Sequence, residues 1–269
     1  MLKIFILIQF LFFFGTASAQ ESTASKQVST FTMEVPQLKT TRKIWLYLPI
    51  GYETSAKKYP VIYMHDAQNL FDKKTSFAGE WNVDEKLDSL KTQAIVVGIE
   101  NGGEKRIDEL TPYKNAKYGG GETDKYLEFI VKTLKPEIDK KYRTKPNTKN
   151  TAIIGSSLGG LTSYYAVIKY PEVFGKAGVF SPAFWINRTE IHDLTTNSKK
   201  IKAKIYFLCG DSEGDDDSIV KDLNSIELLL NTNRCSCLHL NKKVIVKGGH
   251  HNEKLWRDSF DDAIIWLGY

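Results

Sequence analysis

The stretch "TAIIGSSLGGLTSYYAV", residues 151–167, places two adjacent serines between glycines directly after an apolar run. Only one register fits the pattern G-x-S-x-G, and it makes Ser157 the central residue and Ser156 its neighbour. A strand, this pattern and then a helix are typical of a nucleophile elbow, a sharp turn that lifts a serine hydroxyl clear of a sheet. A glycine- and serine-rich turn without chemistry is the alternative. The rest of the chain therefore has to supply a base, an acid and an oxyanion hole.

Apolar runs and helical patterns alternate on both sides of this stretch. Strands are predicted at "YPVIYMH" (59–65), "AIVVGIE" (94–100), "GKAGVFSP" (175–182), "AKIYFLCG" (203–210) and "KVIVKG" (243–248). Helices are predicted at residues 124–142, 158–171, 219–230 and 253–267. Such alternation predicts an α/β domain with a mostly parallel central sheet and helices on both faces. Residues 29–35 and 42–49 alternate apolar and polar side chains, which predicts an antiparallel pair at the sheet edge.

The N-terminus predicts export. Residues 1–19 carry an early lysine, an apolar block and a final "ASA", the pattern of a cleaved signal peptide. The apolar block is shorter than the ~20 residues that a membrane-spanning helix needs. We therefore expect a periplasmic or secreted protein without stable membrane insertion. Residues 20–29 are polar and are expected to form a flexible segment, followed by one folded domain over residues 30–269.

Charge and cysteine usage exclude several function classes. The net charge of +5 comes from scattered lysines, and nucleic-acid-binding proteins usually show a clustered basic stripe. No C-x-x-C pair or H-E-x-x-H spacing is present, so neither a metal site nor a cofactor is expected. Three cysteines, Cys209, Cys235 and Cys237, are too few for a disulfide scaffold, and the sequence leaves their pairing open. It also leaves the oligomeric state open.

A serine nucleophile needs a base, and the chain has five histidines. His192 and His239 lie in polar surroundings typical of the surface. His65 ends a buried strand and is a candidate for the opposite wall of the site. His250 and His251 follow the last strand in a glycine-containing loop that can reach the elbow. We expect one of these two to be the base, and their order alone does not separate them.

The base in turn needs a carboxylate, which comes between the serine and the histidine in α/β hydrolases. The strand at 203–210 ends in "DSEGDDD", which offers five acids: Asp211, Glu213, Asp215, Asp216 and Asp217. Most of them are expected to belong to a solvated acidic loop.

Two backbone amides are candidates for the oxyanion hole. The N–H of Leu158 follows the nucleophile at the start of a helix. The second donor is expected near Ala67 or Gln68, in the loop "HDAQNLFD" after the strand at 59–65. The alternative is a loop that is merely capped by its own Asp and Asn side chains.

Several segments together resemble the Putative esterase family of the α/β hydrolases, over about residues 31–267. The family includes feruloyl and acetyl-xylan esterases, S-formylglutathione hydrolases and enterochelin-type siderophore esterases. The matching segments are "HDAQNLFD", "RIDELTPY", "KPEIDKKYRT", "GSSLGGLTSYYAVIKYPEVFGKAGVFSPAFW" and "GGHHNEKLW". The resemblance implies an α/β-hydrolase fold and hydrolysis of carboxylic esters.

The resemblance also implies particular residues. The family pattern places its catalytic histidine directly before Asn in a closing H-N-E segment, which selects His251 over His250. It places the acid three residues past the glycine that ends the preceding strand, which selects Glu213, with Asp211 in reserve.

The same resemblance bears on the oxyanion loop and the pocket. The family's loop often reads H-D-G-Q-N, so Gln68 is the expected oxyanion residue and Ala67 replaces the family glycine. Trp185 and Trp81 are candidates for lining an acyl or sugar pocket, with ordinary core packing as the alternative.

The function predicted from the sequence is that of an exported serine esterase, acting through a Ser-His-acid triad and an acyl-enzyme on small-molecule or carbohydrate-linked esters. A siderophore esterase, or an acyltransferase that excludes water, is the alternative within the enzymes. A non-catalytic binding module on the same fold is the alternative outside them. Arg106 and Glu109 are expected to form an ion pair that braces a loop of the site, or to contact substrate.

Overall fold

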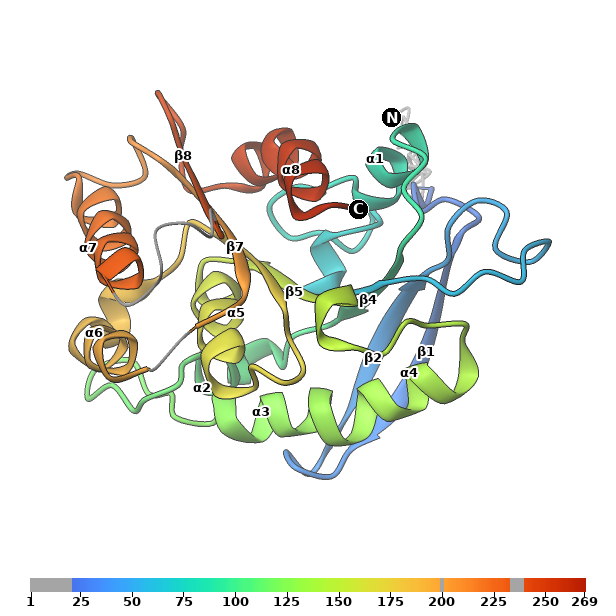
Figure 1. Cartoon of the computed structure of the whole chain (residues 1–269), viewed down its shortest axis with the longest axis horizontal. Coiled ribbons are helices and arrows are strands. Elements are labelled where there is room, and N and C mark those ends of the chain that lie inside the picture. The colour runs from blue at the N-terminus through green and yellow to red at the C-terminus, as the bar shows by residue number, and fades with distance from the viewer. Residues whose placement is uncertain (1–20, 199–200, 233–239) are drawn as a thin grey trace, which may run out of the picture.

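An eight-stranded sheet runs through the protein in the computed structural model, which describes residues 21–198, 201–232 and 240–269 (Figure 1). Its strands are β1 (Val28–Val35), β2 (Thr40–Tyr47), β3 (Val61–His65), β4 (Ile95–Ile99), β5 (Thr151–Ser156), β6 (Lys176–Phe180), β7 (Lys204–Gly210) and β8 (Asn241–Val246). Their order in the sheet is β1-β2-β4-β3-β5-β6-β7-β8. β2 pairs antiparallel with β1 and with β4, and every other pairing is parallel. The predicted mostly parallel sheet with an antiparallel edge pair is confirmed.

Helices cover both faces of this sheet, as predicted. They are α1 (Val83–Ser89), α2 (Arg106–Leu110), α3 (Thr123–Phe129), α4 (Lys135–Lys141), α5 (Leu158–Lys169), α6 (Arg188–Asn197), α7 (Ser218–Thr232) and α8 (Glu253–Leu267). α1 and α8 lie on one side and α3, α4 and α5 on the other (Figure 1). A π-helical turn over Ile130–Leu134 joins α3 to α4, so the helical pattern predicted over 124–142 is one nearly continuous element.

The strand side chains explain why two helical layers form. β5 is buried along its whole length, and its successive side chains point to opposite faces. Ile153 packs into the core under α3, α4 and α5, whereas Ala152 and Ile154 pack into the core under α1 and α8. A strand that is apolar on both faces is stable only when both faces are covered.

Residues 22–25, which we call the N-terminal hook, lie against the loop before α1. Ser22 Oγ donates to Asp72 Oδ2 at 2.6 Å, and the Ser25 amide donates to Asp84 Oδ2 at 2.6 Å. β1 then begins at Val28. The segment expected to be a flexible lead-in over residues 20–29 thus includes hydrogen-bonded residues and the start of a strand.

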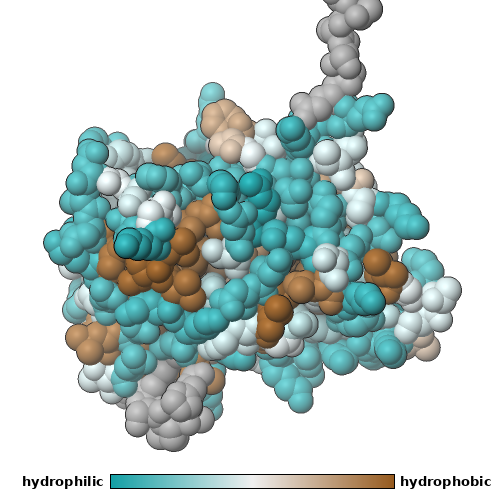
Figure 2. Space-filling model, turned by 90° about the horizontal axis from the view of Figure 1, so that it is seen from above, coloured by the Kyte–Doolittle hydropathy of each residue, from teal (hydrophilic) through white to brown (hydrophobic). Residues whose placement is uncertain are grey.

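The hydropathy of one face of the molecule and of the described helices bears on membrane association. Seen from above, the molecule is mostly hydrophilic, with apolar residues gathered in separate patches (Figure 2). Among the described residues, no helix is long and apolar enough to cross a membrane. Cys209 is a free, buried thiol, whereas Cys235 and Cys237 lie outside the described residues.

Candidate active site

Ser157 occupies a sharp turn between β5 and α5, as the sequence predicts. Its backbone has φ 57° and ψ −120°, a combination that costs of the order of 1–3 kcal/mol in a non-glycine residue. The turn is held because the Ser157 amide donates to the carbonyl of Phe180 at 2.9 Å, and its own carbonyl accepts from Leu161 and Ala183 at 3.0 Å. Strain at one residue that its neighbours fix in this way is typical of a nucleophile elbow.

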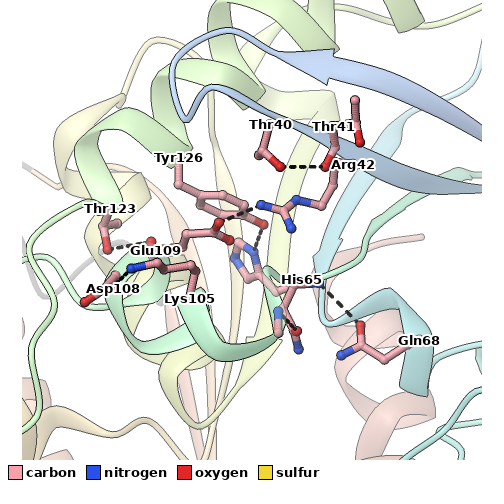
Figure 3. A network of polar contacts seen from close by, with 12 residues as sticks. Thr40, Thr41, Arg42, His65, Gln68, Lys105, Asp108, Glu109, Thr123 and Tyr126 are labelled. Carbon is pink, nitrogen blue, oxygen red and sulfur yellow. Dashed lines mark hydrogen bonds and ion pairs between the residues drawn. The ribbon is translucent and has the colours of Figure 1, made fainter.

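His65 lies directly beneath this turn. A Cβ atom on Gly155 would come within 2.7 Å of His65 Cδ2, so only glycine fits there. The His65 side chain is buried, and its Nδ1 lies 2.8 Å from the hydroxyl of Tyr126 (Figure 3). Burial lowers the pKa of His65 to about 4, so the ring is neutral at pH 7. The predicted position on the opposite wall of the site is wrong, because the ring packs under the elbow.

His251 meets Glu213 in the loops that follow β8 and β7. His251 Nδ1 lies 2.7 Å from Glu213 Oε2, with side-chain exposures of 36% and 1%. An imidazole that binds a buried carboxylate through Nδ1 has its Nε2 available as a base. These are the two residues that the resemblance selected for the base and the acid.

Two further residues hold Glu213 in place, and sequence reasoning missed both. Ser181 Oγ donates to Glu213 Oε1 at 2.6 Å, and Trp256 Nε1 donates to Ser181 Oγ at 2.8 Å. The Gly210 amide adds a third donor to the carboxylate, at 2.5 Å from Oε1. Trp256 also packs edge-on against the His251 ring, with centroids 5.2 Å apart. A serine directly after a strand at the same sheet edge was the available signal for Ser181.

The other candidate acid and histidines have different contacts. Asp211 is exposed, and its Oδ1 accepts from the Gly248 amide at 2.7 Å and from Ser212 Oγ at 2.9 Å, so it braces the loop before His251. His250 Nδ1 lies 2.7 Å from the Ser212 carbonyl. His192 is exposed on α6, and His239 lies outside the described residues.

The two predicted oxyanion residues both lie near Ser157. Leu158 is the first residue of α5, so its amide has no carbonyl of its own helix to bind. Gln68 lies in the 3-10 turn η1 (Ala67–Asn69) and lines a cavity together with Ser157. Ala67 is accommodated because it packs against Gly98, where any Cβ would come within 2.9 Å of the Ala67 methyl.

Arg106 and Glu109 do not pair with each other, so the predicted ion pair between them is wrong. Arg106 binds Asp66 through two contacts of 2.7 and 2.9 Å, and Asn101 adds a third hydrogen bond to Asp66 at 2.6 Å. Glu109 binds Arg42 of β2 at 2.6 Å, with both side chains buried (Figure 3). Burial opposes ionisation of Asp66, but Arg106 and Asn101 outweigh it and lower the pKa of this carboxyl. The loop that carries Gln68, the predicted oxyanion residue, is therefore anchored through Asp66.

Two cavities meet at Ser157 and His251. One, of about 330 Å³, is lined by Trp185, Ser181 and Glu213 as well; we call it the Trp185 cavity. The other, of about 640 Å³, is lined by Gln68, Phe77 and Arg106; we call it the Arg106 cavity. Two separate spaces thus open beside Ser157.

The two predicted pocket tryptophans differ. Trp185 is 49% exposed, lines the Trp185 cavity and meets Tyr118 edge-on, with ring centroids 5.3 Å apart. Trp81 is 2% exposed and stacks on Phe180 within the core between the sheet and α8. The prediction that Trp81 lines the pocket is wrong, since core packing removes it from the surface.

Comparisons with known proteins find a matching family model and several relatives. Residues 36–267 match the family model described as "Putative esterase". The protein YbbA of Bacillus subtilis (strain 168) is 28% identical over 241 residues, which cover 84% of this chain and 92% of that protein. An endo-1,4-beta-xylanase/feruloyl esterase of Xylanibacter ruminicola is 27% identical over 197 residues, or 70% of this chain and 25% of that protein.

Solved structures share the fold at lower identity. A ferulic acid esterase superposes with a TM-score of 0.68 at 17% identity, over 89% of this chain and 97% of that one. The enterobactin esterase of Shigella flexneri superposes with a TM-score of 0.69 at 16% identity, over 91% of this chain and 60% of that one. Both likenesses support the predicted α/β-hydrolase fold.

Proposed function

This chain belongs to the Putative esterase family, and we propose that it is a serine esterase that works through Ser157, His251 and Glu213. The observation that carries the proposal is the 2.7 Å contact between His251 Nδ1 and the buried Glu213 carboxylate, beside a serine in a strained turn. This arrangement fixes the tautomer that leaves His251 Nε2 free to take a proton.

The reaction follows from the positions of these groups. His251 Nε2 takes the Ser157 hydroxyl proton as Oγ attacks the ester carbonyl carbon. The Leu158 amide and an amide in the region of Gln68 stabilise the negative charge that develops on the carbonyl oxygen. The C–O bond to the alcohol breaks, and the alcohol leaves with the proton from His251, which yields an acyl-serine. Water, deprotonated by His251, then releases the acid and restores Ser157.

Glu213 keeps the imidazolium of this cycle oriented. Its carboxylate accepts hydrogen bonds from Ser181, the Gly210 amide and His251, so the negative charge is stabilised without exposure to water. His251 itself is partly exposed, which supports hydrolysis over an acyltransferase reaction that excludes water.

The two cavities support an ester with two bulky halves. The edge-on pair of Trp185 and Tyr118 at the Trp185 cavity suits an aromatic or sugar ring. The names of one relative and one structural neighbour point to feruloyl esters. Another structural neighbour, an enterobactin esterase, adds siderophore esters as the alternative. We further propose that residues 1–19 direct export, which would give the enzyme access to polysaccharide-linked esters.

The direct test is hydrolysis of p-nitrophenyl acetate by wild type and Ser157→Ala. We expect the variant to lose at least about 10³-fold in kcat, since the residual rate comes only from binding and the oxyanion hole. Equal rates would exclude the proposed nucleophile, and equal rates at the uncatalysed level would favour a binding module. A panel of feruloyl, acetyl-sugar and catecholate esters, each measured as kcat/KM, would then identify the substrate class.

A further inference from the structure

We propose that Glu80, Asp84 and Glu85 form a calcium site that ties the N-terminal hook and the loop beside the Arg106 cavity to α1. These three residues, the acid cluster, each offer a carboxylate oxygen, and the three oxygens lie within 4.8 Å of one another. Ca²⁺ binds oxygens at about 2.3–2.6 Å, so ligands on opposite sides of one ion lie at most about 5 Å apart. The spacing therefore fits a shared ion.

The acid cluster is short of positive charge. Asp84 is 0% exposed and Glu80 is 6% exposed, and buried carboxylates normally pair with a cation. Among the described residues, none of the three acids forms an ion pair with Lys, Arg or His. The nearby Arg257 donates to the main-chain carbonyl of Glu80 at 2.9 Å, and Lys86 pairs with Asp261. α1 has only seven residues, so its N-terminus compensates little of this charge.

Unpartnered oxygens in the same place are the second observation. Asp84 Oδ1 and Glu85 Oε2 are buried and have no hydrogen-bond partner in the described part of the chain. The Ser25 hydroxyl is buried without a partner as well, and the amide of the same residue binds Asp84. Carboxylate and hydroxyl oxygens without donors are what a hard cation requires.

The position of the acid cluster gives the ion a structural role. Thr23 Oγ1 lies 3.0 Å from both carboxylate oxygens of Glu80, and it accepts from the Lys73 amide at 2.8 Å. Between Lys73 and Glu80 the chain passes Phe77, which lines the Arg106 cavity. An ion in the acid cluster would fix both ends of this loop, independently of the reaction at Ser157.

The first test is terbium luminescence of the full chain. Tb³⁺ substitutes for Ca²⁺, and Trp81, next to Glu80 in the sequence, would sensitise its emission. We expect saturable emission that Ca²⁺ displaces and that K⁺ at equal ionic strength does not. Absence of saturable emission, or emission that Ca²⁺ leaves unchanged, would overturn the proposal.

The second test locates the site by thermal unfolding. Calcium at about a hundred times its Kd should raise the Tm of wild type by about 5–10 °C over EDTA. Asp84→Asn and Glu85→Gln should each lose most of this rise. Glu137→Gln, a charge-matched control in an exposed pair with Lys141, should keep it. If either cluster variant fails to fold, the other serves alone.

Two outcomes would contradict the site. A calcium effect that survives in every folded cluster variant would place the ion elsewhere. A Tm that ignores calcium but falls as the pH rises to about 8, in wild type and not in Glu85→Gln, would show that a shared proton holds the acid cluster together.

Discussion

Glu213 and the acid cluster are both buried carboxylate groups, but their surroundings are opposite. Glu213 accepts hydrogen bonds from Ser181, the Gly210 amide and His251. In the acid cluster, Asp84 Oδ1 and Glu85 Oε2 have no donor among the described residues. A buried charge is stable where hydrogen-bond donors surround it, and without donors it needs a counter-charge. Glu213 is thus positioned for one partner within the chain, His251, whereas the acid cluster suits a cation from solution.

The largest effect is expected at Glu213. Glu213→Gln should lower kcat for p-nitrophenyl acetate by about 10⁴-fold, because a neutral amide no longer fixes the tautomer of His251 or stabilises its charged form. Asp211→Asn, the matched control two residues away, should stay within about threefold of wild type. A larger loss in Asp211→Asn than in Glu213→Gln would give Asp211 the catalytic role and leave Glu213 as a structural residue.

His65 is a third buried titratable group and is intermediate between the two. Its Nδ1 has a hydrogen-bond partner, whereas its Nε2 has none in the described part of the chain. Its folded-state pKa is lowered to about 4 against 6.5 when unfolded. The unfolded chain therefore binds the extra proton between these values. We therefore expect His65 to leave the free energy of unfolding unchanged above pH 6.5. As the pH falls towards 4, protonation of the unfolded chain should lower that free energy by up to about 3 kcal/mol.

Denaturant unfolding at several pH values measures this loss. His65→Gln should flatten the fall in stability between pH 6.5 and 4, whereas His192→Gln, on the exposed face of α6, should leave it unchanged. An unaltered slope in His65→Gln would mean that other groups control stability in acid.

Ser181→Ala should have an intermediate effect on catalysis. It removes one donor to Glu213 and leaves the Trp256 N–H unpaired, at a cost of about 1–3 kcal/mol. We expect kcat to fall by roughly tenfold or more with a smaller change in KM. Ser212→Ala, whose hydroxyl binds the exposed Asp211, is the control and should behave as wild type. Equal kinetics in both variants would show that Glu213 does not depend on its donors.

The smallest effect, and one of opposite sign, is expected in the acid cluster. In EDTA, Asp84→Asn should raise the Tm by about 2–4 °C, because one of three crowded negative charges disappears. Glu137→Gln should change it by less. A lower Tm in Asp84→Asn under these conditions would mean that the carboxylate is already compensated in the folded chain.

The sequence predicted what depends on neighbours along the chain. Ser157 could be predicted because strand, turn and helix follow one another within a few residues. The antiparallel pair of β1 and β2 could be predicted because the alternation of apolar and polar side chains is a local pattern. His251 and Glu213 required the family resemblance, since five acids and two histidines compete in the same two loops. The Arg42–Glu109 and Arg106–Asp66 pairs join residues 67 and 40 positions apart, and no local pattern indicates such partners.

The burial of Trp81 and of the acid cluster could not be predicted from the sequence. Both lie around the start of α1, where the sequence pattern of a tryptophan and several acids is equally compatible with exposed and with buried side chains. Only the packing of α8 against this segment decides, since it buries Trp81 and closes over its neighbours.

The backbone of Ser157 has a consequence for laboratory evolution. Glycine adopts φ 57° and ψ −120° without the penalty that serine carries, so Ser157→Gly is expected to be more heat-resistant than wild type while inactive. A library selected only for survival at high temperature would therefore enrich the loss of its own nucleophile. Selection for turnover has to be applied in the same round for this position to keep its serine.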